Sequence, residues 1–417
     1  MRMKFNRLSQ LVLVSVVSLL AAGLVTACGT LTVDFVFVTS ARAAGPNNYG
    51  EVNVFEVNSE SGFMRQIPTS PFPSGGRNPV AEAASADSTT LYVINEDDNT
   101  IVQFTVGNDG KLYPQNTLNT PGVFPLAVAV TANYLYVADT YQPLPTCSTA
   151  APCSGSVAAY PILNAAAAQA LKPPQSADSL GSPVANSSIS ANYWPLNLTN
   201  NPTHVLTPTA ITSAASGAYV YVAAFDATSG GGYVFGFTVN SDGTLAAMAG
   251  SPFAAGTHPS AIAADPGGNY VYVTDFAKGD VLTYSVGSGP LTPVAGSPFP
   301  AGNAPAAIVI DGTGKYAYVA NSQDANLTAY SISNGVLSFL GSSSTPVAYA
   351  TGTQPVAIGI DPSLNQYLYT ANFLGNNVSG FQLNATDGTL LNSQKSPYPS
   401  NANPTAIAAI PHGTPKK

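Results

Sequence analysis

The sequence predicts an all-β fold, a seven-bladed β-propeller with four antiparallel strands in each blade. A proline, a short apolar strand, a tight turn and a second strand ending in Tyr-Val or an equivalent follow one another seven times. Five of the six intervals between these prolines are 46 to 51 residues long, and the interval from Pro125 to Pro208 is 83 residues long. A period of about 40–50 residues is typical of propellers and solenoids. The seven prolines are Pro79, Pro125, Pro208, Pro259, Pro305, Pro355 and Pro404.

Each repeat can be divided into four strands, A to D, and residues 259–300 are a plain example. Strand A is "SAIAAD", strand B is "YVYVTD" after the turn "DPGGN", strand C is "VLTYSV", and strand D runs toward "AGSPFPAG". Alternating aromatic and β-branched residues suit sheets that pack on neighbours on both faces. Four antiparallel strands per repeat make one blade of a propeller.

The two ends of the chain predict how the ring closes. The first repeat begins at strand B, "VDFVFVTS", and the chain finishes with a lone strand A, "NPTAIAAIP". Together they complete blade 1, which leaves no free sheet edge. We therefore predict one propeller domain over residues 34–413, followed by a tail at 414–417.

The first residues predict export. A basic start precedes an apolar run, Leu11–Leu24, that is short for a membrane span. The residues Val-Thr-Ala before Cys28 resemble a bacterial lipoprotein signal. We expect a signal peptide over 1–27, a lipidated Cys28 and a linker over 28–33. The alternative is a plain secretory signal, cleaved after Ala43.

The chain has three cysteines, an odd number for an exported protein. If Cys28 carries lipid, Cys147 and Cys153 remain, six positions apart in one loop. We expect them to form a disulfide in an oxidising compartment. The expected location is the cell envelope, on the periplasmic side of a membrane or at the cell surface.

The charge balance limits the partners. The formal net charge is −8, and three of the thirteen basic residues lie in the signal peptide. A nucleic-acid-binding protein would show a basic footprint, so we expect no nucleic acid. Membrane contact is expected through the lipid anchor only. The expected partner is a small polar ligand or an envelope protein, and the expected state is a monomer.

Two loop regions are longer than their counterparts in other repeats. In a propeller, the D–A and B–C loops share one face, and insertions on one face often mark a binding face. We predict insertions on this face at about 139–156 and 186–205. The second contains Tyr193 and the single tryptophan, Trp194. The two are expected to touch and to form a lid over the channel mouth, although Trp194 could instead be an apolar plug.

The residues before each strand-A proline should ring the channel mouth, and the B–C loops should add to it. We predict His258, Glu96 and Arg77 as catalytic candidates, because an imidazole or a carboxylate can act as a general base. The alternative for His258 is an ordinary loop histidine before a turn. Glu82 replaces an apolar residue of strand A and is interpreted as a channel-facing acid, or as a partner of Arg77. The predicted ligand-binding residues are Asn78, Glu82, Tyr193, Trp194, Asp275, Gln354 and Asn403. No metal-binding or cofactor-binding motif is present, and none of either is expected.

The repeats resemble the YVTN-type propeller repeat, as in "YVTD" at 272–275, "YVAN" at 318–321 and "DPSLNQYLYTANFLGNNVSGF" at 361–381. The chain is similar to the bacterial lactonase-like propeller superfamily, which includes 6-phosphogluconolactonase-type enzymes and muconate cyclases. The phosphogluconolactonase branch carries Pro-Arg-His at strand A, where this chain has Pro79-Val80-Ala81 and similar triplets. Its Asn-Glu before strand C is matched by Asn95-Glu96.

Three functions are consistent with these patterns. The first is a lipid-anchored envelope module that binds a ligand or a protein. The second, which the resemblance implies, is a lactone hydrolase that acts at the channel mouth. The third is a purely structural module. A base and a cation that converge at the mouth would favour the enzyme, and an uncharged mouth with an aromatic rim would favour binding.

Overall fold

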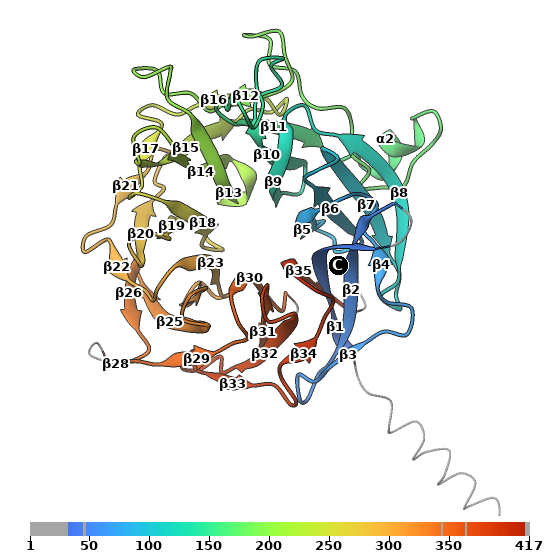
Figure 1. Cartoon of the computed structure of the whole chain (residues 1–417), viewed down its shortest axis with the longest axis vertical. Helices are drawn as coiled ribbons and strands as arrows, with labels where there is room; N and C mark the ends of the chain where they lie inside the picture. Colours follow the sequence, from blue (N-terminus) through green and yellow to red (C-terminus); the bar gives the residue numbers. More distant parts are fainter. Residues whose placement is uncertain (1–31, 45–46, 343–344, 363–364, 413–417) are drawn as a thin grey trace, which may run out of the picture.

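The computed structural model describes residues 32–412, except 45–46, 343–344 and 363–364. Seven sheets of four or five strands stand around a central axis in these residues (Figure 1). The structure confirms the predicted all-β, seven-bladed propeller. The predicted signal peptide, Cys28 and the tail 414–417 lie outside the described residues.

Blade 1 contains strands from both ends of the chain, which confirms the predicted closure. Its strands, from the centre outward, are β35 (Pro404–Pro411), β1 (Thr32–Ala44), β2 (Tyr49–Asn58) and β3 (Met64–Gln66), and β4 (Phe72–Pro73) also pairs with β2. In the register of β1 on β35, Val36 is opposite Ala409 and Val38 is opposite Ile407. Strand β1 begins two residues before the predicted domain start.

The other six blades follow one another along the chain. Blade 2 contains β5 (Pro79–Ala84), β6 (Thr90–Asn95), β7 (Thr100–Val106) and β8 (Leu112–Asn119), and blade 3 contains β9 (Val123–Val130), β10 (Tyr134–Tyr141), β11 (Ser156–Pro161) and β12 (Trp194–Pro195). Blade 4 contains β13 (Leu206–Ala214), β14 (Tyr219–Asp226), β15 (Gly232–Val239), β16 (Leu245–Ala247) and β17 (Phe253–Ala254). Blade 5 contains β18 (Pro259–Ala264), β19 (Tyr270–Asp275), β20 (Asp280–Ser285), β21 (Thr292–Pro293) and β22 (Phe299–Pro300).

Blade 6 contains β23 (Pro305–Ile310), β24 (Tyr316–Asn321), β25 (Asn326–Ser333), β26 (Val336–Phe339) and β29 (Ala348–Ala350), and a separate hairpin, β27 (Gly341–Ser342) and β28 (Thr345–Pro346), precedes β29. Blade 7 contains β30 (Pro355–Ile360), β31 (Tyr367–Asn372), β32 (Asn377–Leu383), β33 (Leu390–Asn392) and β34 (Tyr398–Pro399). Two short helices complete the description: α2 (Ala165–Gln169) and the 3-10 helix η1 (Ala215–Gly217).

The core lies between adjacent blades, as expected when each sheet has two apolar faces. All six residues of strands β6, β24 and β31 are buried. On strand A, an aliphatic side chain near the middle packs against the preceding blade. Ile308 of blade 6, for example, belongs to one buried cluster with Tyr272 and Val281 of blade 5. We call each such contact between adjacent blades a seam.

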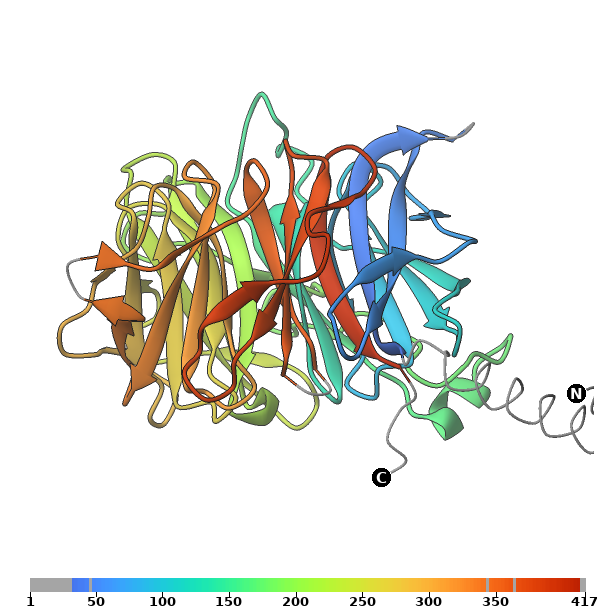
Figure 2. The ribbon, with the colours of Figure 1, turned by 90° about the horizontal axis from the view of Figure 1, so that it is seen from below.

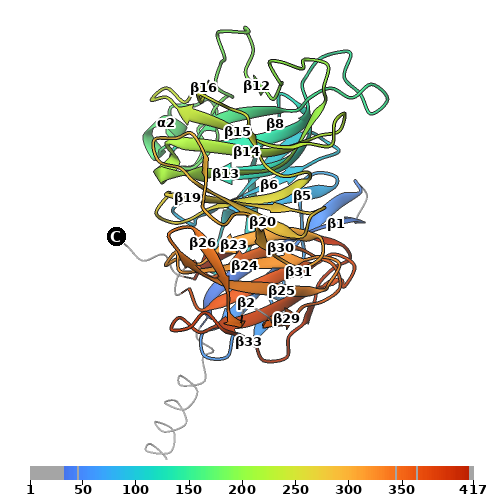
Figure 3. The ribbon, with the colours of Figure 1, turned by 90° about the vertical axis from the view of Figure 1, so that its left-hand side faces the viewer.

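The two faces of the ring carry different connections. The face with the D–A and B–C loops, which includes residue 258, is called the mouth face. The face with the A–B and C–D turns, which includes residues 265–269, is called the turn face. Figure 2 shows that β1 begins and β35 ends on the side of the ring where α2 lies, which is the turn face. Seen from the side in Figure 3, α2 and the loop after β10 project from opposite sides of the ring.

Strand pairing in blade 3 shows that the predicted insertion at 186–205 contains a piece of strand D. Trp194 is opposite Val157 of strand C, as Phe253 is opposite Val234 in blade 4. Trp194-Pro195 is therefore the blade 3 version of the Phe-Pro pair that forms the last piece of strand D elsewhere. Strand D of blade 3 begins near Leu180, because the amides of Gly181 and Val184 donate to the carbonyls of Pro161 and Ala159 in strand C. Residues 163–179 are therefore the C–D connection, 185–193 interrupt strand D, and 196–205 form the D–A loop on the mouth face.

Candidate ligand site at the channel mouth

Two rows of residues meet at the mouth of the ring. The first row precedes each strand-A proline, and the second row follows strand B. Backbone hydrogen bonds join the two rows. In blade 2 the amide of Glu96 donates to the carbonyl of Asn78 over 2.9 Å, and in blade 5 the amide of Phe276 donates to the carbonyl of His258 over 2.9 Å. Five first-row residues have a φ between 52° and 58°, the left-handed region that non-glycine residues seldom adopt. They are Asn78, Phe124, Ala304, Gln354 and Asn403.

Blade 2 contributes a polar cluster to the mouth. The Asn78 side chain donates to Glu96 Oε2 over 2.7 Å. Arg77 forms an ion pair of 2.6 Å with Asp98, and its Nε donates to the same carboxylate over 2.7 Å. The Arg77 guanidinium is about half exposed, at 51% of its side-chain surface. The structure thus brings three predicted site residues together. Arg77 is paired with Asp98, so the alternative that it pairs with Glu82 is wrong.

The Glu96 carboxyl is an acid of this cluster whose pKa is shifted upward. Burial and the neighbouring charge of Asp97 raise its pKa above the ordinary value. A carboxyl with a raised pKa can take up a proton closer to neutral pH, which is what a general base requires.

Blade 5 and its neighbour contribute an aromatic cluster. The His258 imidazole lies edge-on to Phe225 of blade 4, with ring centroids 4.5 Å apart, and to Phe276, at 5.7 Å. All three side chains are partly exposed. On blade 3, Phe124 and Tyr141 form a similar edge-on pair with centroids 6.0 Å apart. No hydrogen bond or ring contact among the described residues joins His258 to Arg77 or Glu96. The predicted catalytic trio is therefore split between blades 2 and 5.

Asp275 supports the loop that carries His258. Its carboxylate is fully buried and accepts the backbone amides of Thr257 over 2.6 Å, His258 over 3.1 Å and Lys278 over 3.2 Å. Burial alone would raise the pKa of Asp275, but these hydrogen bonds outweigh it and lower the pKa. Because the carboxylate is buried and its oxygens accept these loop amides, Asp275 positions His258 and does not face a ligand at the mouth.

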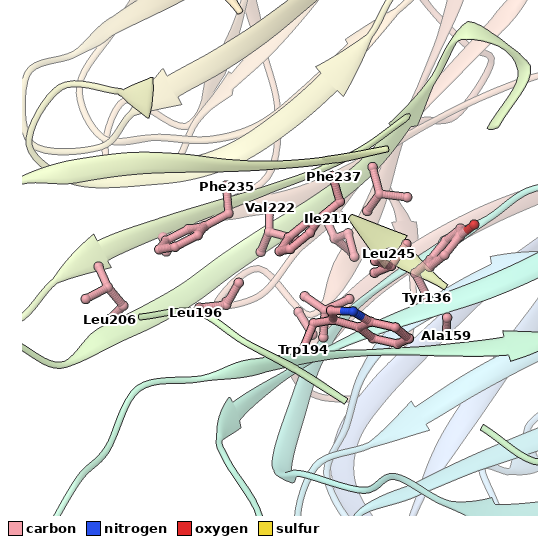
Figure 4. Close-up of a cluster of buried hydrophobic side chains, with 14 of the residues drawn as sticks. Tyr136, Ala159, Trp194, Leu196, Leu206, Ile211, Val222, Phe235, Phe237 and Leu245 are labelled. Carbon is pink, nitrogen blue, oxygen red and sulfur yellow. The ribbon is translucent and has the colours of Figure 1, made fainter. Parts of the chain in front are cut away.

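The remaining predicted residues are at the mouth or in the core. Gln354 and Asn403 are partly exposed in the first row. Glu82 is buried at the seam with blade 1, where the backbones of Thr39 and Ala408 face its carboxyl. Trp194 is 7% exposed in the cluster between blades 3 and 4, and Figure 4 shows its indole beside Ala159 and Tyr136. Tyr193 is 9% exposed. These last three side chains are parts of the packed interior.

The long loops of blades 3 and 4 contact one another on the mouth face. The Cys147–Cys153 disulfide, expected from the sequence, lies in the loop after β10. In that loop, the Gln142 side chain donates to Asn197 over 3.0 Å, and the Ser154 hydroxyl donates to the His204 carbonyl over 3.1 Å. In Figure 1 these loops extend from the outer part of blades 3 and 4.

These loops also contain His204, to which sequence reasoning gave no role. His204 Nδ1 lies 2.5 Å from Oδ2 of the buried Asp226. Burial would raise the pKa of Asp226, but hydrogen bonds from Ser229, His204 and Thr228 lower it to about 2. The pair attaches the D–A loop to blade 4. Sequence reasoning also missed the aromatic residues of the second row at the mouth. An alignment of the repeats at the end of strand B would have found them, because Phe225, Phe276 and Phe373 occupy equivalent positions there.

No group of three or more His, Cys, Asp or Glu side chains suited to a metal occurs among the described residues. Within the same part of the chain, no helix has the length and apolar character needed to cross a bilayer.

Comparison with known proteins places the fold. The family described as "Lactonase, 7-bladed beta-propeller" matches residues 291–408. Over these residues the chain is similar to that family, and the fold of the described residues is a seven-bladed propeller. A putative 6-phosphogluconolactonase from Bacteroides uniformis is similar over 91% of this chain and 100% of its own, with a TM-score of 0.66 at 18% identity. The periplasmic gluconolactonase of Pseudomonas aeruginosa is similar over 92% and 100%, with a TM-score of 0.67 at 17% identity.

A less similar propeller is apo AztD from Citrobacter koseri, with a TM-score of 0.51 at 12% identity over 91% of this chain and 98% of its own. No match was found among curated protein sequences. The resemblance predicted from the repeats is thus confirmed, and these identities establish similarity of fold.

Proposed function

We propose that this chain is an exported, lipid-anchored propeller that binds a small polar ring, such as a sugar, at its channel mouth. The single observation that carries this proposal is the aromatic cluster of His258, Phe225 and Phe276. Aromatic faces and edges bind the apolar faces of sugar rings, while amide and carboxyl groups bind the hydroxyls. The Asn78–Glu96 pair and Gln354 supply such groups on other blades.

The charge of the mouth supports a neutral ligand over a phosphorylated one. A phosphate site needs Arg or Lys donors. At the mouth, the loop after β6 carries three acids, Glu96, Asp97 and Asp98, beside Arg77, and their net negative charge opposes a phosphate. Strand A carries Val80-Ala81 where the phosphogluconolactonase branch has Arg-His.

Binding can be tested by NMR because the chain has three histidines. Methyl α-D-glucopyranoside is titrated into labelled protein, and the His258 ring signal is assigned with His258→Gln. We expect this signal to shift while that of His412, on the turn face, stays constant. Phe276→Ala should weaken binding roughly 3- to 10-fold. A His258 signal that stays constant with this sugar and with sodium gluconate would exclude a sugar site at the mouth.

A second candidate is lactone hydrolysis with Glu96 as the general base. Two observations favour it: the raised pKa of Glu96 beside Asn78, and the similarity in fold to proteins named gluconolactonases. Glu96 would take a proton from water as the water attacks the lactone carbonyl, and would return it to the departing ring oxygen. Hydrolysis of D-glucono-1,5-lactone, followed by acid release, should then fall at least about 100-fold in Glu96→Gln. Equal rates in Glu96→Gln and the parent would exclude this role.

Export and anchoring are supported by the sequence around Cys28 and by the Cys147–Cys153 disulfide, which is typical of oxidising compartments. Metabolic labelling with a palmitate analogue tests the anchor. The parent should carry the label, and Cys28→Ser should carry none. A parent without acyl chains would contradict lipidation at this residue.

A further inference from the structure

A cavity of about 470 Å³ lies on the turn face, at the seam between blades 1 and 2. Its volume is within the range of roughly 300–1,000 Å³ that is usual for small-molecule sites. It is far from the mouth, and neither proposed function uses it. Its walls include side chains from both terminal strands of the fold: Thr32 and Phe35 of β1, and His412 after β35.

The floor of this cavity is aromatic and fixed in place. The rings of Phe35 and His412 meet edge-on, with centroids 5.3 Å apart, and the amide of His412 donates to the carbonyl of Val33 over 2.8 Å. Gly110 packs on the other side of Phe35 with a φ of +75°, where a Cβ would lie 2.6 Å from the ring. A side chain at 110 would displace this ring, so the floor depends on the glycine.

The rim carries two ion pairs, and each of them joins one cation to one carboxylate. Arg65 is paired with Glu56 on blade 1, and Lys111 is paired with Asp109 on blade 2, with 2.5 Å between Lys111 Nζ and Asp109 Oδ2. Arg65 and Lys111 are 64% and 39% exposed. Exposed pairs of this kind contribute about 1 kcal/mol or less, so a ligand can exchange their partners at little cost.

We propose that this cavity binds the zwitterionic headgroup of a membrane phospholipid, a phosphate joined to an ammonium group. The phosphate lies between Arg65 and Lys111, which are the donors that phosphate prefers. The ammonium lies near Glu56 and Asp109, the two carboxylates of the rim. A headgroup with both charges fits a rim with both charges, whereas an anionic headgroup would meet two carboxylates in a protein whose net charge is −8.

The source of the headgroup follows from the position of the cavity, and this step rests on the proposed anchor. Thr32 lines the cavity and is four residues after Cys28, a reach of at most about 14 Å. A lipid on Cys28 holds the turn face at the bilayer surface. The mouth face then points away from the membrane, toward soluble ligands.

The experiment uses the chain from residue 28 with Cys28→Ser, so that only the cavity can hold the protein on a membrane. Flotation is measured with phosphatidylcholine vesicles that contain phosphatidylethanolamine, and with phosphatidylglycerol vesicles. Glycerophosphoethanolamine, the free zwitterionic headgroup, is titrated by calorimetry. We expect binding to the zwitterionic vesicles and to glycerophosphoethanolamine, and at least about tenfold weaker binding in Arg65→Gln/Lys111→Gln.

Lys315→Gln is the matched control, because Lys315 is an exposed lysine on the same face in blade 6, and it should bind as the parent does. Equal binding by the double variant and the parent overturns the proposal. Binding of the free headgroup with no flotation on the zwitterionic vesicles overturns the lipid source. A failure of the anchor appears separately, as parent protein that carries no acyl chain while the Cys28→Ser chain still binds vesicles.

Discussion

The seam between blades 1 and 2 and the seam between blades 5 and 6 use equivalent strands but contain different side chains. In the latter, Ile308 packs on Tyr272 and Val281 in a buried apolar cluster. In the former, the equivalent position is Glu82, whose carboxyl oxygens have no hydrogen bond of good geometry. The backbones of Thr39 and Ala408 are its polar neighbours. Blade 1, on one side of this seam, is the blade within which the ring closes, and the headgroup cavity lies at the same seam.

We infer from this difference that the fold does not require every seam to be apolar. Each blade is held by two seams, so a polar residue in one is tolerated if the others are well packed. The cost is a dependence on pH that the apolar seams lack.

Removal of residues 403–417 should have the largest effect. It deletes strand A of blade 1, and β1 then loses its pairing with Ala409 and Ile407. An open edge favours aggregation. We expect loss of cooperative urea unfolding, measured by circular dichroism. Removal of 413–417 alone is the control and should leave the transition unchanged. A 403–417 deletion that unfolds like the parent would refute closure by β35.

The change Ile308→Glu transfers the polar residue to the apolar seam. A buried carboxyl without a designed environment should lower the free energy of unfolding by about 3 kcal/mol or more. The control Ile308→Val removes one methylene and should cost roughly 0.5–1.5 kcal/mol. Similar losses for the two variants would show that the seams tolerate polarity equally.

Glu82 should make stability depend on pH. Burial raises the pKa of Glu82 to about 8 from an ordinary value of 4.5. Because the folded protein then keeps a proton that the unfolded chain releases, the free energy of unfolding should fall as the pH rises from 4.5 to 8 and level off above it. Asp139, whose pKa burial raises to about 7, acts in the same direction.

Urea unfolding of the parent, Glu82→Gln and Glu82→Ile at several pH values measures this effect. Glu82→Gln should flatten part of the slope. Glu82→Ile should restore the apolar seam and raise the free energy of unfolding by roughly 2 kcal/mol at pH 7. An unchanged slope in both variants would mean that the carboxyl is ionised in the folded protein.

The smallest effect is expected for the double variant Cys147→Ser/Cys153→Ser. The disulfide closes a loop of six residues outside every seam, so its loss should lower the free energy of unfolding by roughly 2 kcal/mol at most. Thermal unfolding should remain a single transition. A larger loss than that of Ile308→Glu would give the loop an unexpected role in holding blades 3 and 4 together.

The repeat pattern was enough to predict the blades, the closure and the odd position of Glu82. It could not show where Glu82 points, because the side chain's surroundings come from Thr39 and Ala408, far away in the sequence. Trp194 was misplaced because "YWP" replaces the usual Ser-Pro-Phe-Pro of strand D, and the shared signal is only an aromatic residue before a proline.

The candidate site was predicted in part. The rows before and after the strands locate Asn78, Glu96 and His258 at the mouth, because repeat register fixes the backbone. Partner choice depends on side-chain reach, which the register does not determine. Arg77 therefore pairs with Asp98 instead of Glu82. The His204–Asp226 pair joins two irregular loops, for which no repeat offers a template.

The pairing of β1 with β35 also sets the order of events during biogenesis. The first strand to leave the ribosome waits for the strand that ends at Pro411, which is about 370 residues later in the chain. If the chain is exported unfolded, as the proposed signal peptide implies, its blades can begin to form one by one as they emerge. The ring then cannot close until residue 404 and those after it have crossed the membrane. Until then the edge of β1 is open to other chains, so a holding chaperone in the receiving compartment would act on this protein chiefly at its first strand.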